Sequence, residues 1–202
     1  CMVSTPTFDP ENRPDVEGNP DRYEGVYINR LLSAAYTPGS VFKLITAEAA
    51  IDTIKDIDTR TYECAAEKLI DGNRITCPAA HGNMTFKQAL AHSCNVTFAE
   101  ITLEIGGATL QKYADKAGFN SSHKVNGIST SAGKVDVSNA KGGYLAWAGI
   151  GQYSNTANPL SFMTYVGAIG NDGIKVTPSI IKDSNVILSL LPDIVPEGDR
   201  II

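Results

Sequence analysis

A serine and a lysine stand three residues apart at the start of an apolar segment. Residues 35–50 read AYTPGSVFKLITAEAA, with Ser40 directly after Pro38-Gly39 and Lys43 inside the apolar part. Residues three apart on a helix share one face, with about 5–6 Å between their Cβ atoms. Apolar surroundings lower the pKa of a lysine, so that its neutral amine can take a proton from a nearby hydroxyl. The pattern therefore indicates an activated serine nucleophile.

The place of Ser40 at the start of the predicted helix adds a second chemical feature. Backbone N–H groups in a first helical turn lack partners within the helix, and the helix dipole is positive there. That end can stabilise an oxyanion that forms on a substrate. A plainer interpretation stays open on these residues alone: Ser40 caps the helix and Lys43 reaches the solvent, because Ser-x-x-Lys occurs by chance in many chains.

A second polar group, Ser93-Cys94-Asn95, interrupts a helical pattern further along the chain. With Ser40-x-x-Lys43 it resembles two of the three motifs of penicillin-binding proteins, which are acyl-serine transferases. Other segments are similar to landmarks of that family and follow in the family's order. These segments are residues 3–10, 81–82, 86–90, 149–152, 158–160 and 171–173.

The resemblance implies a role for each of these residues. Ser40 would be the nucleophile, and Lys43 the base that takes its proton. Ser93 would relay a proton to the leaving amine, while Asn95 would bind the substrate's backbone amide and help to fix Lys43. The oxyanion would bind the backbone N–H of Ser40 and a second N–H from a strand after the third motif. A bland alternative for Ser93 and Asn95 is a pair of helix-breaking caps.

The third family motif, Lys-Thr-Gly or Lys-Ser-Gly, does not occur in this sequence. Lys141-Gly142-Gly143 precedes residues 149–152, whereas the family motif follows that landmark, so it is not counted. The chain starts with Cys1 and stops at Ile202, and both ends look cut. We expect residues 1–202 to be one transpeptidase domain truncated before the third-motif strand, and to be acylated poorly by itself because half of the oxyanion hole is missing.

The resemblance also implies a fold and an activity. The fold would be α+β, the penicillin-binding/β-lactamase-like transpeptidase fold, with a helical subdomain and part of an antiparallel sheet. The activity would be that of a peptidoglycan D,D-transpeptidase without cofactor, acylated at Ser40 by D-Ala-D-Ala stem peptides and by β-lactams. It would work at the outer face of the bacterial cytoplasmic membrane, anchored by a segment outside this chain. Other cell-wall synthesis proteins, such as a glycosyltransferase, would be its partners.

Other functions of the same fold stay open. They are a D,D-carboxypeptidase, a serine β-lactamase, a non-enzymatic β-lactam sensor and a domain whose Ser-x-x-Lys is inert. A β-lactamase needs a placed base for deacylation, and no Glu-x-x-x-Asn follows Ser93. This favours slow deacylation, as in a transpeptidase.

Composition excludes several other classes of function. Of the 202 residues, 43% are hydrophobic and 19% charged, which is typical of a globular domain. The net charge of −5 and the lack of a basic run argue against nucleic acid as a partner. No stretch approaches the ~18 apolar residues of a membrane helix, and the first residues lack a signal-peptide pattern.

The cysteines permit two interpretations and favour no metal site. Cys64 and Cys77 flank a short loop, so they could form a disulfide in an oxidising compartment or stay separate thiols. No Cys-x-x-Cys pair occurs, and the three histidines lack metal-ligand spacing. We therefore predict no metal site, and interpret Cys94 as a packed free thiol.

Periodicity and capping residues predict the elements that position these side chains. Asn158-Pro159 and the capping box Thr85-x-x-Gln88 each mark a helix start. The predicted helices are residues 27–32, 40–54, 86–92, 96–105, 108–117 and 159–169. A small hairpin is expected within 62–76, a loop over 119–143, and short strands at 175–177 and 186–191.

Overall fold

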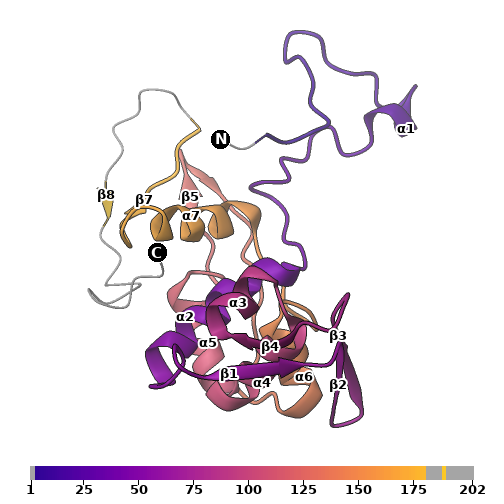
Figure 1. Cartoon of the computed structure of the whole chain (residues 1–202). Coiled ribbons are helices and arrows are strands. Elements are labelled where there is room, and N and C mark those ends of the chain that lie inside the picture. Colours follow the sequence, from indigo (N-terminus) through magenta and orange to yellow (C-terminus); the bar gives the residue numbers. More distant parts are fainter. Residues whose placement is uncertain (1–2, 181–187, 190–202) are drawn as a thin grey trace.

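The computed structural model of the protein describes residues 3–180 and 188–189. The helices in this part are α1 (Pro20–Tyr23), the 3-10 helix η1 (Gly39–Phe42), α2 (Lys43–Thr53), α3 (Phe86–Ala91), α4 (Asn95–Ile105), α5 (Gly107–Lys116), α6 (Gly142–Gly149) and α7 (Pro159–Ile169). The strands are β1 (Thr61–Cys64), β2 (Glu67–Ile70), β3 (Asn73–Thr76), β4 (Gly82–Thr85), β5 (Lys124–Val125), β6 (Ile128–Ser129), β7 (Lys175–Val176) and β8 (Leu188–Ser189). Helices α2–α6 and strands β1–β4 form one body, and an N-terminal arm leaves it (Figure 1).

Helix α2 lies at the centre of this body, as its apolar sequence predicts. Ile45, Ala47, Ala49 and Ala50 have no exposed surface. Ala47 and Ala50 belong to an apolar cluster that α4 and α6 complete, and Ile45 and Ala49 belong to another that α5 and α7 complete. The predicted helix over residues 40–54 is confirmed, as η1 followed by α2. Its first turn carries Lys43 into the interior.

Helix α6 was not predicted, because glycines stand at both of its ends within the sequence GGYLAWAG. Its packing against α4 makes up for that low propensity. A side chain at Gly149 would meet Thr102 of α4, with the added Cβ only 1.8 Å from the Thr102 hydroxyl oxygen. Thr46 of α2 donates a hydrogen bond to the Gly149 carbonyl at 2.7 Å. Helices α2, α4 and α6 are thus locked together behind the first turn of α2.

The strands of the described residues form four two-stranded antiparallel sheets, paired β1-β4, β2-β3, β5-β6 and β7-β8. The expected hairpin is confirmed for β2-β3, where Glu67 faces Thr76. Strand β1 pairs instead with β4, so that Cys64 faces Gly82 across the hairpin that is inserted between them. Strand β4 then enters α3 through the predicted capping box of Thr85 and Gln88.

The helices predicted at 86–92, 96–105 and 108–117 are confirmed as α3, α4 and α5. The other two helix predictions lie nearer the ends of the chain, and only one of them is confirmed. The helix predicted at 159–169 is confirmed as α7, and the Asn158 side chain accepts hydrogen bonds from its first N–H groups. The helix predicted at 27–32 is wrong, because Asn29 accepts the N–H groups of Leu31 and Leu32 with its side chain and closes a turn. Of the strand predicted at 186–191, only β8 lies within the described residues.

Among the described residues, no helix combines the length and the apolar character that crossing a bilayer requires.

Candidate active site

Ser40 lies in the tight turn that begins η1. Pro38 precedes it, and Gly39 has a φ of +59°, a left-handed conformation that glycine adopts without strain. The chain around Gly151 presses on this turn, because an added Cβ there would lie 1.9 Å from the Gly39 carbonyl oxygen. Gly39 in turn donates its N–H to the Gly151 carbonyl at 2.9 Å. The segment at 149–152 thereby fixes the turn that presents Ser40, whose side chain is exposed.

Lys43 is the polar centre of the site. It is 1% exposed, and its Nζ lies 3.0 Å from Ser40 Oγ, 2.9 Å from Ser93 Oγ and 2.6 Å from Asn95 Oδ1. A fourth oxygen, the Ser93 carbonyl, lies at 2.9 Å. All four oxygens are uncharged, and no ion pair of the described residues includes Lys43.

These surroundings favour the neutral amine. Burial lowers the pKa of Lys43 to about 8, and the nearby thiols of Cys77 and Cys94 oppose that shift only in part. A protonated lysine has three N–H donors for these four oxygens, whereas a neutral amine has two donors and one lone pair. The hydroxyl of Ser40 can therefore turn its proton toward Nζ. The geometry suits proton transfer from Ser40 to Lys43.

Ser93 and Asn95 reach Lys43 from the junction between α3 and α4. Ser93 has a φ of +52°, which is uncommon for a residue with a side chain and makes a sharp turn before α4. Asn95 is the first residue of α4, and its Nδ2 donates to the Thr76 carbonyl at the end of β3 at 2.7 Å. This bond orients the amide so that its oxygen faces Lys43. The structure thus brings Ser40, Lys43, Ser93 and Asn95 together, fifty residues apart in sequence.

Such an arrangement supports nucleophilic acyl transfer. Ser40 can attack a carbonyl, Lys43 can accept its proton, and Ser93 lies within hydrogen-bond distance of the same amine, so that a proton can move onward to a leaving group. The backbone N–H of Ser40 is in the first turn, where an oxyanion can bind. No redox or metal step is needed for this chemistry.

The sequence analysis missed one further group of residues beside this site. Cys64, Cys77, His81 and Cys94 bring one ligand atom each to within 4.8 Å of one another. The three cysteines are free thiols. No spacing rule could find the group, because the residues come from the end of β1, the turn after β3, the start of β4 and the start of α4. They are the residues of this site that could hold a metal ion.

Comparisons with known proteins agree with the geometry. The family model for the penicillin binding protein transpeptidase domain matches residues 1–190. The chain belongs to this family. The peptidoglycan D,D-transpeptidase PbpA of Mycolicibacterium smegmatis is 27% identical over 220 residues, which cover 99% of this chain and 44% of that penicillin-binding protein.

Solved structures of penicillin-binding proteins share the fold. Penicillin-binding protein A from M. tuberculosis, in a ceftriaxone acyl-enzyme complex, superposes with a TM-score of 0.76 at 24% identity and covers 88% of this chain and 43% of its own. PBP2 in its complex with MreC from Helicobacter pylori superposes with a TM-score of 0.77 at 22% identity, and the match covers 92% of this chain and 36% of the PBP2 chain. The expected α+β penicillin-binding fold is confirmed. The chain spans less than half the length of these relatives.

Proposed function

We propose that the complete protein containing this chain is a peptidoglycan D,D-transpeptidase with Ser40 as its nucleophile. The observation that carries the proposal is the buried amine of Lys43, held between Ser40 Oγ and Ser93 Oγ at 3.0 and 2.9 Å. A buried lysine with neutral partners is costly for folding, and it becomes useful where a base is needed near neutral pH.

The reaction would proceed in two balanced steps. Ser40 Oγ attacks the carbonyl carbon between the two D-alanines of a stem peptide, and Lys43 takes the hydroxyl proton. The C–N bond then breaks, the proton passes through Ser93 to the departing D-alanine amine, and an ester remains on Ser40. An amine of a second stem peptide attacks that ester and forms the cross-linking amide bond. The C–O bond to Ser40 breaks, and the proton lost by the amine returns through Ser93 and Lys43 to Ser40 Oγ. Asn95 would hold the substrate's amide beside Lys43.

β-Lactams would acylate the same serine by opening their ring, with no group leaving. That reading agrees with the ceftriaxone acyl-enzyme of the M. tuberculosis relative. The complete protein would act at the outer face of the bacterial cytoplasmic membrane, through an anchor outside this chain. Its partners would be other proteins of cell-wall synthesis, such as a glycosyltransferase or a scaffold like the MreC bound to the H. pylori relative.

Intact mass spectrometry of the complete protein after exposure to penicillin G tests the proposal. We expect the mass of one penicillin to be added, and none on the Ser40→Ala variant. A stem peptide supplied with an acceptor amine should then give a cross-linked product. Hydrolysis without cross-linking would indicate a carboxypeptidase instead, and acylation without any turnover of the peptide would indicate a sensor.

The 202-residue chain alone is expected to be acylated poorly. It contains no Lys-Thr-Gly or Lys-Ser-Gly motif, whose strand supplies one oxyanion donor in this family. Losing one such donor costs about 10²–10³ in rate. The measurement is the rate of labelling by a fluorescent penicillin, chain against complete protein, and equal rates would contradict the expectation.

A further inference from the structure

Four residues that the proposed reaction does not use meet directly behind the Ser93-Asn95 turn. Cys64 is the last residue of β1 and Cys77 follows β3, while His81 precedes β4 and Cys94 precedes α4. Their ligand atoms all lie within 4.8 Å of one another. Thiolate sulfur and imidazole nitrogen are the ligands of structural zinc sites, and three cysteines with one histidine form a common set.

The spacing of these atoms fits a tetrahedral ion. Two ligands bound to zinc at about 2.3 Å lie about 3.8 Å apart along a tetrahedral edge. The Sγ atoms of Cys77 and Cys94 are 3.7 Å apart. No two of the four ligand atoms are more than 4.8 Å apart, which exceeds that edge by about 1 Å at most.

His81 supplies an independent observation. Its Nδ1 is buried and has no hydrogen-bond partner, although buried polar groups are nearly always paired. The imidazole of His92 stacks on the His81 ring at 5.6 Å between centroids, with 19° between the planes, and so holds its orientation. A buried imidazole nitrogen that lacks a hydrogen-bond partner and lies next to three thiols is suited to bind a metal ion.

Two of the sulfur atoms accept hydrogen bonds from backbone N–H groups. The backbone N–H of Asn95 donates to Cys77 Sγ at 3.2 Å, and that of Thr97 donates to Cys94 Sγ at 3.4 Å. Hydrogen bonds from backbone N–H groups to ligand atoms are the outer-shell contacts that orient and stabilise metal ligands. Cys64 and Cys94 are 1% and 0% exposed, so solvent does not compete for these thiols.

We propose that Cys64, Cys77, His81 and Cys94 bind one zinc ion in a closed tetrahedral site. Soft thiolate ligands select zinc over magnesium or calcium, which prefer oxygen. Four protein ligands leave no open position, so the ion is structural and takes no part in acyl transfer. A disulfide between two of the thiols is the competing state, and it would leave the buried His81 Nδ1 still unpaired.

The ion would tie the strands to the active-site turn. Cys94 stands between Ser93 and Asn95, and Cys77 follows the residue whose carbonyl orients the Asn95 amide. One ion would therefore hold together β1, the segment between β3 and β4, and the first turn of α4. Metal binding itself does not depend on the proposed transpeptidase function, since it can be measured without any acylation assay.

The test uses the complete protein, purified under reducing conditions without chelator. We expect one zinc per chain by elemental analysis. After zinc is removed anaerobically, added Co²⁺ should give the intense visible bands of a tetrahedral site and a thiolate-to-cobalt charge-transfer band. Cys77→Ser and His81→Ala should weaken metal affinity by more than the ~10–100-fold that follows loss of an outer-shell partner.

His92→Ala is the matched control. It removes a histidine that stacks on His81 but lies outside the four ligands. It should keep the bound zinc and the tetrahedral cobalt spectrum, with a loss of affinity no greater than the ~10–100-fold of an outer-shell partner. A variant that fails to fold does not decide the test, because zinc content and the cobalt spectrum are read on the unaltered protein. The proposal is overturned if that protein, reduced and given zinc, binds none, or if the cobalt spectrum is octahedral. It is also overturned if non-reducing peptide mapping of protein purified without reductant finds two of the three cysteines disulfide-linked.

Discussion

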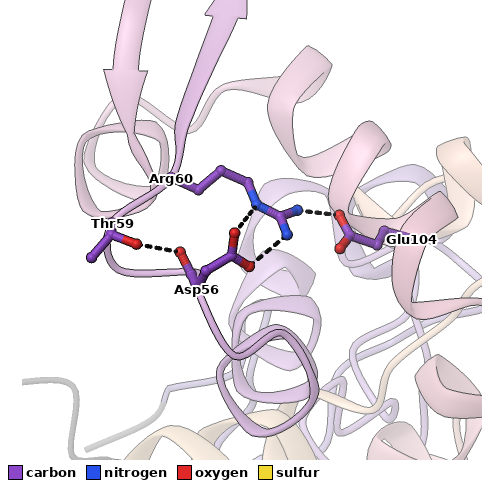
Figure 2. Close-up of polar contacts among 4 residues, drawn as sticks. All are labelled: Asp56, Thr59, Arg60 and Glu104. Atoms are coloured by element: carbon purple, nitrogen blue, oxygen red, sulfur yellow. Dashed lines mark hydrogen bonds and ion pairs between the residues drawn. The ribbon is translucent and has the colours of Figure 1, made fainter.

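Helix α4 is bonded to a basic side chain near each of its ends, and the two basic side chains have opposite surroundings. At the N-terminal ends, Lys43 of α2 bonds to Asn95, the first residue of α4, at 2.6 Å. Beyond the C-terminal end of α2, Arg60 pairs with Asp56 at 2.6 Å and with Glu104 of α4 at 2.5 Å (Figure 2). Helix α4 is thus tied at one end to α2 and at the other end to the turn that follows α2.

The difference lies in burial and in the charge of the partners. Lys43 is buried among uncharged oxygens, and burial lowers its pKa to about 8. The Arg60 side chain is 31% exposed and faces two carboxylates. Hydrogen bonds to Asp56 and then Glu104 raise the pKa of Arg60 further above its ordinary value. The Arg60 end holds a permanent charge, whereas the Lys43 end holds a proton that can leave, and this separates a structural bridge from a reactive one.

The largest expected effect comes from removing each cation in turn. Lys43→Met keeps the length of the side chain and removes the base, so penicillin acylation of the complete protein should fall by about 10²–10⁴-fold. Arg60→Met should leave that rate within about twofold, as distant surface changes usually do. Labelling by a fluorescent penicillin measures both, with circular dichroism to verify folding. Equal losses in the two variants would contradict the comparison.

The sequence predicted the Lys43 end better than the rest of the molecule. Ser40 and Lys43 share one turn of a helix, so their contact follows from local geometry alone. Their meeting with Ser93 and Asn95 followed only from the family resemblance, since no periodicity relates residues fifty positions apart. The catalytic roles of these residues stay predictions.

What could not be predicted depends on tertiary packing. Helix α6 forms because Gly149 allows a close approach to Thr102, and a propensity scale counts that glycine as unfavourable. The pairing of β1 with β4 encloses a separate hairpin, so that Cys64 reaches His81 across a gap that no spacing rule covers. The turn at Asn29 replaced a predicted helix because a side chain competed for the backbone N–H groups.

Asn95→Asp should give Lys43 a carboxylate partner, as Arg60 already has. It places a carboxylate where an uncharged oxygen now lies 2.6 Å from Lys43 Nζ. An opposite charge at this distance raises the pKa of the lysine by about 1–3, which lowers the neutral fraction at pH 7 by about 10–10³-fold. The pH midpoint of acylation should rise accordingly. Asn95→Ala is the control, because it removes the hydrogen bond without adding charge and should not raise the midpoint.

The unaltered protein should itself show a pH dependence. In the proposed reaction the active form of Lys43 would be the neutral amine, whose fraction grows as pH rises toward its pKa of about 8. Acylation should therefore increase about tenfold per pH unit below that value and level off above it. Cys77 and Cys94 are the titratable groups whose charges act on the pKa of Lys43, and both oppose its lowering. Stopped-flow measurement of the acylation rate at a series of pH values gives the profile. A rate that is independent of pH between about 6 and 9, a range that extends about one to two units to either side of the pKa, would argue against Lys43 as the base.

The smallest effect is expected at the Arg60 end, on stability alone. Arg60→Met should lower the unfolding midpoint slightly, because exposed ion pairs contribute little and salt screens them. The hydrogen bond from Arg60 lowers the pKa of Asp56. The contribution of the Arg60–Asp56 ion pair to the free energy of unfolding is therefore present above the unfolded-state pKa of Asp, about 3.9. That contribution is lost as pH falls through the lower pKa that Asp56 has in the folded state.

Thermal unfolding at neutral and acidic pH, with and without high salt, measures this difference between Arg60→Met and the unaltered protein. The difference should shrink in acid and in salt, while the acylation rate stays unchanged throughout. Glu104→Gln is the matched variant on α4, and it should show a smaller difference of the same kind, because it removes one of the two ion pairs of Arg60 and leaves the pair with Asp56. A difference that persists in strong acid would mean that Arg60 stabilises the fold through packing of its methylene groups and not through its charge.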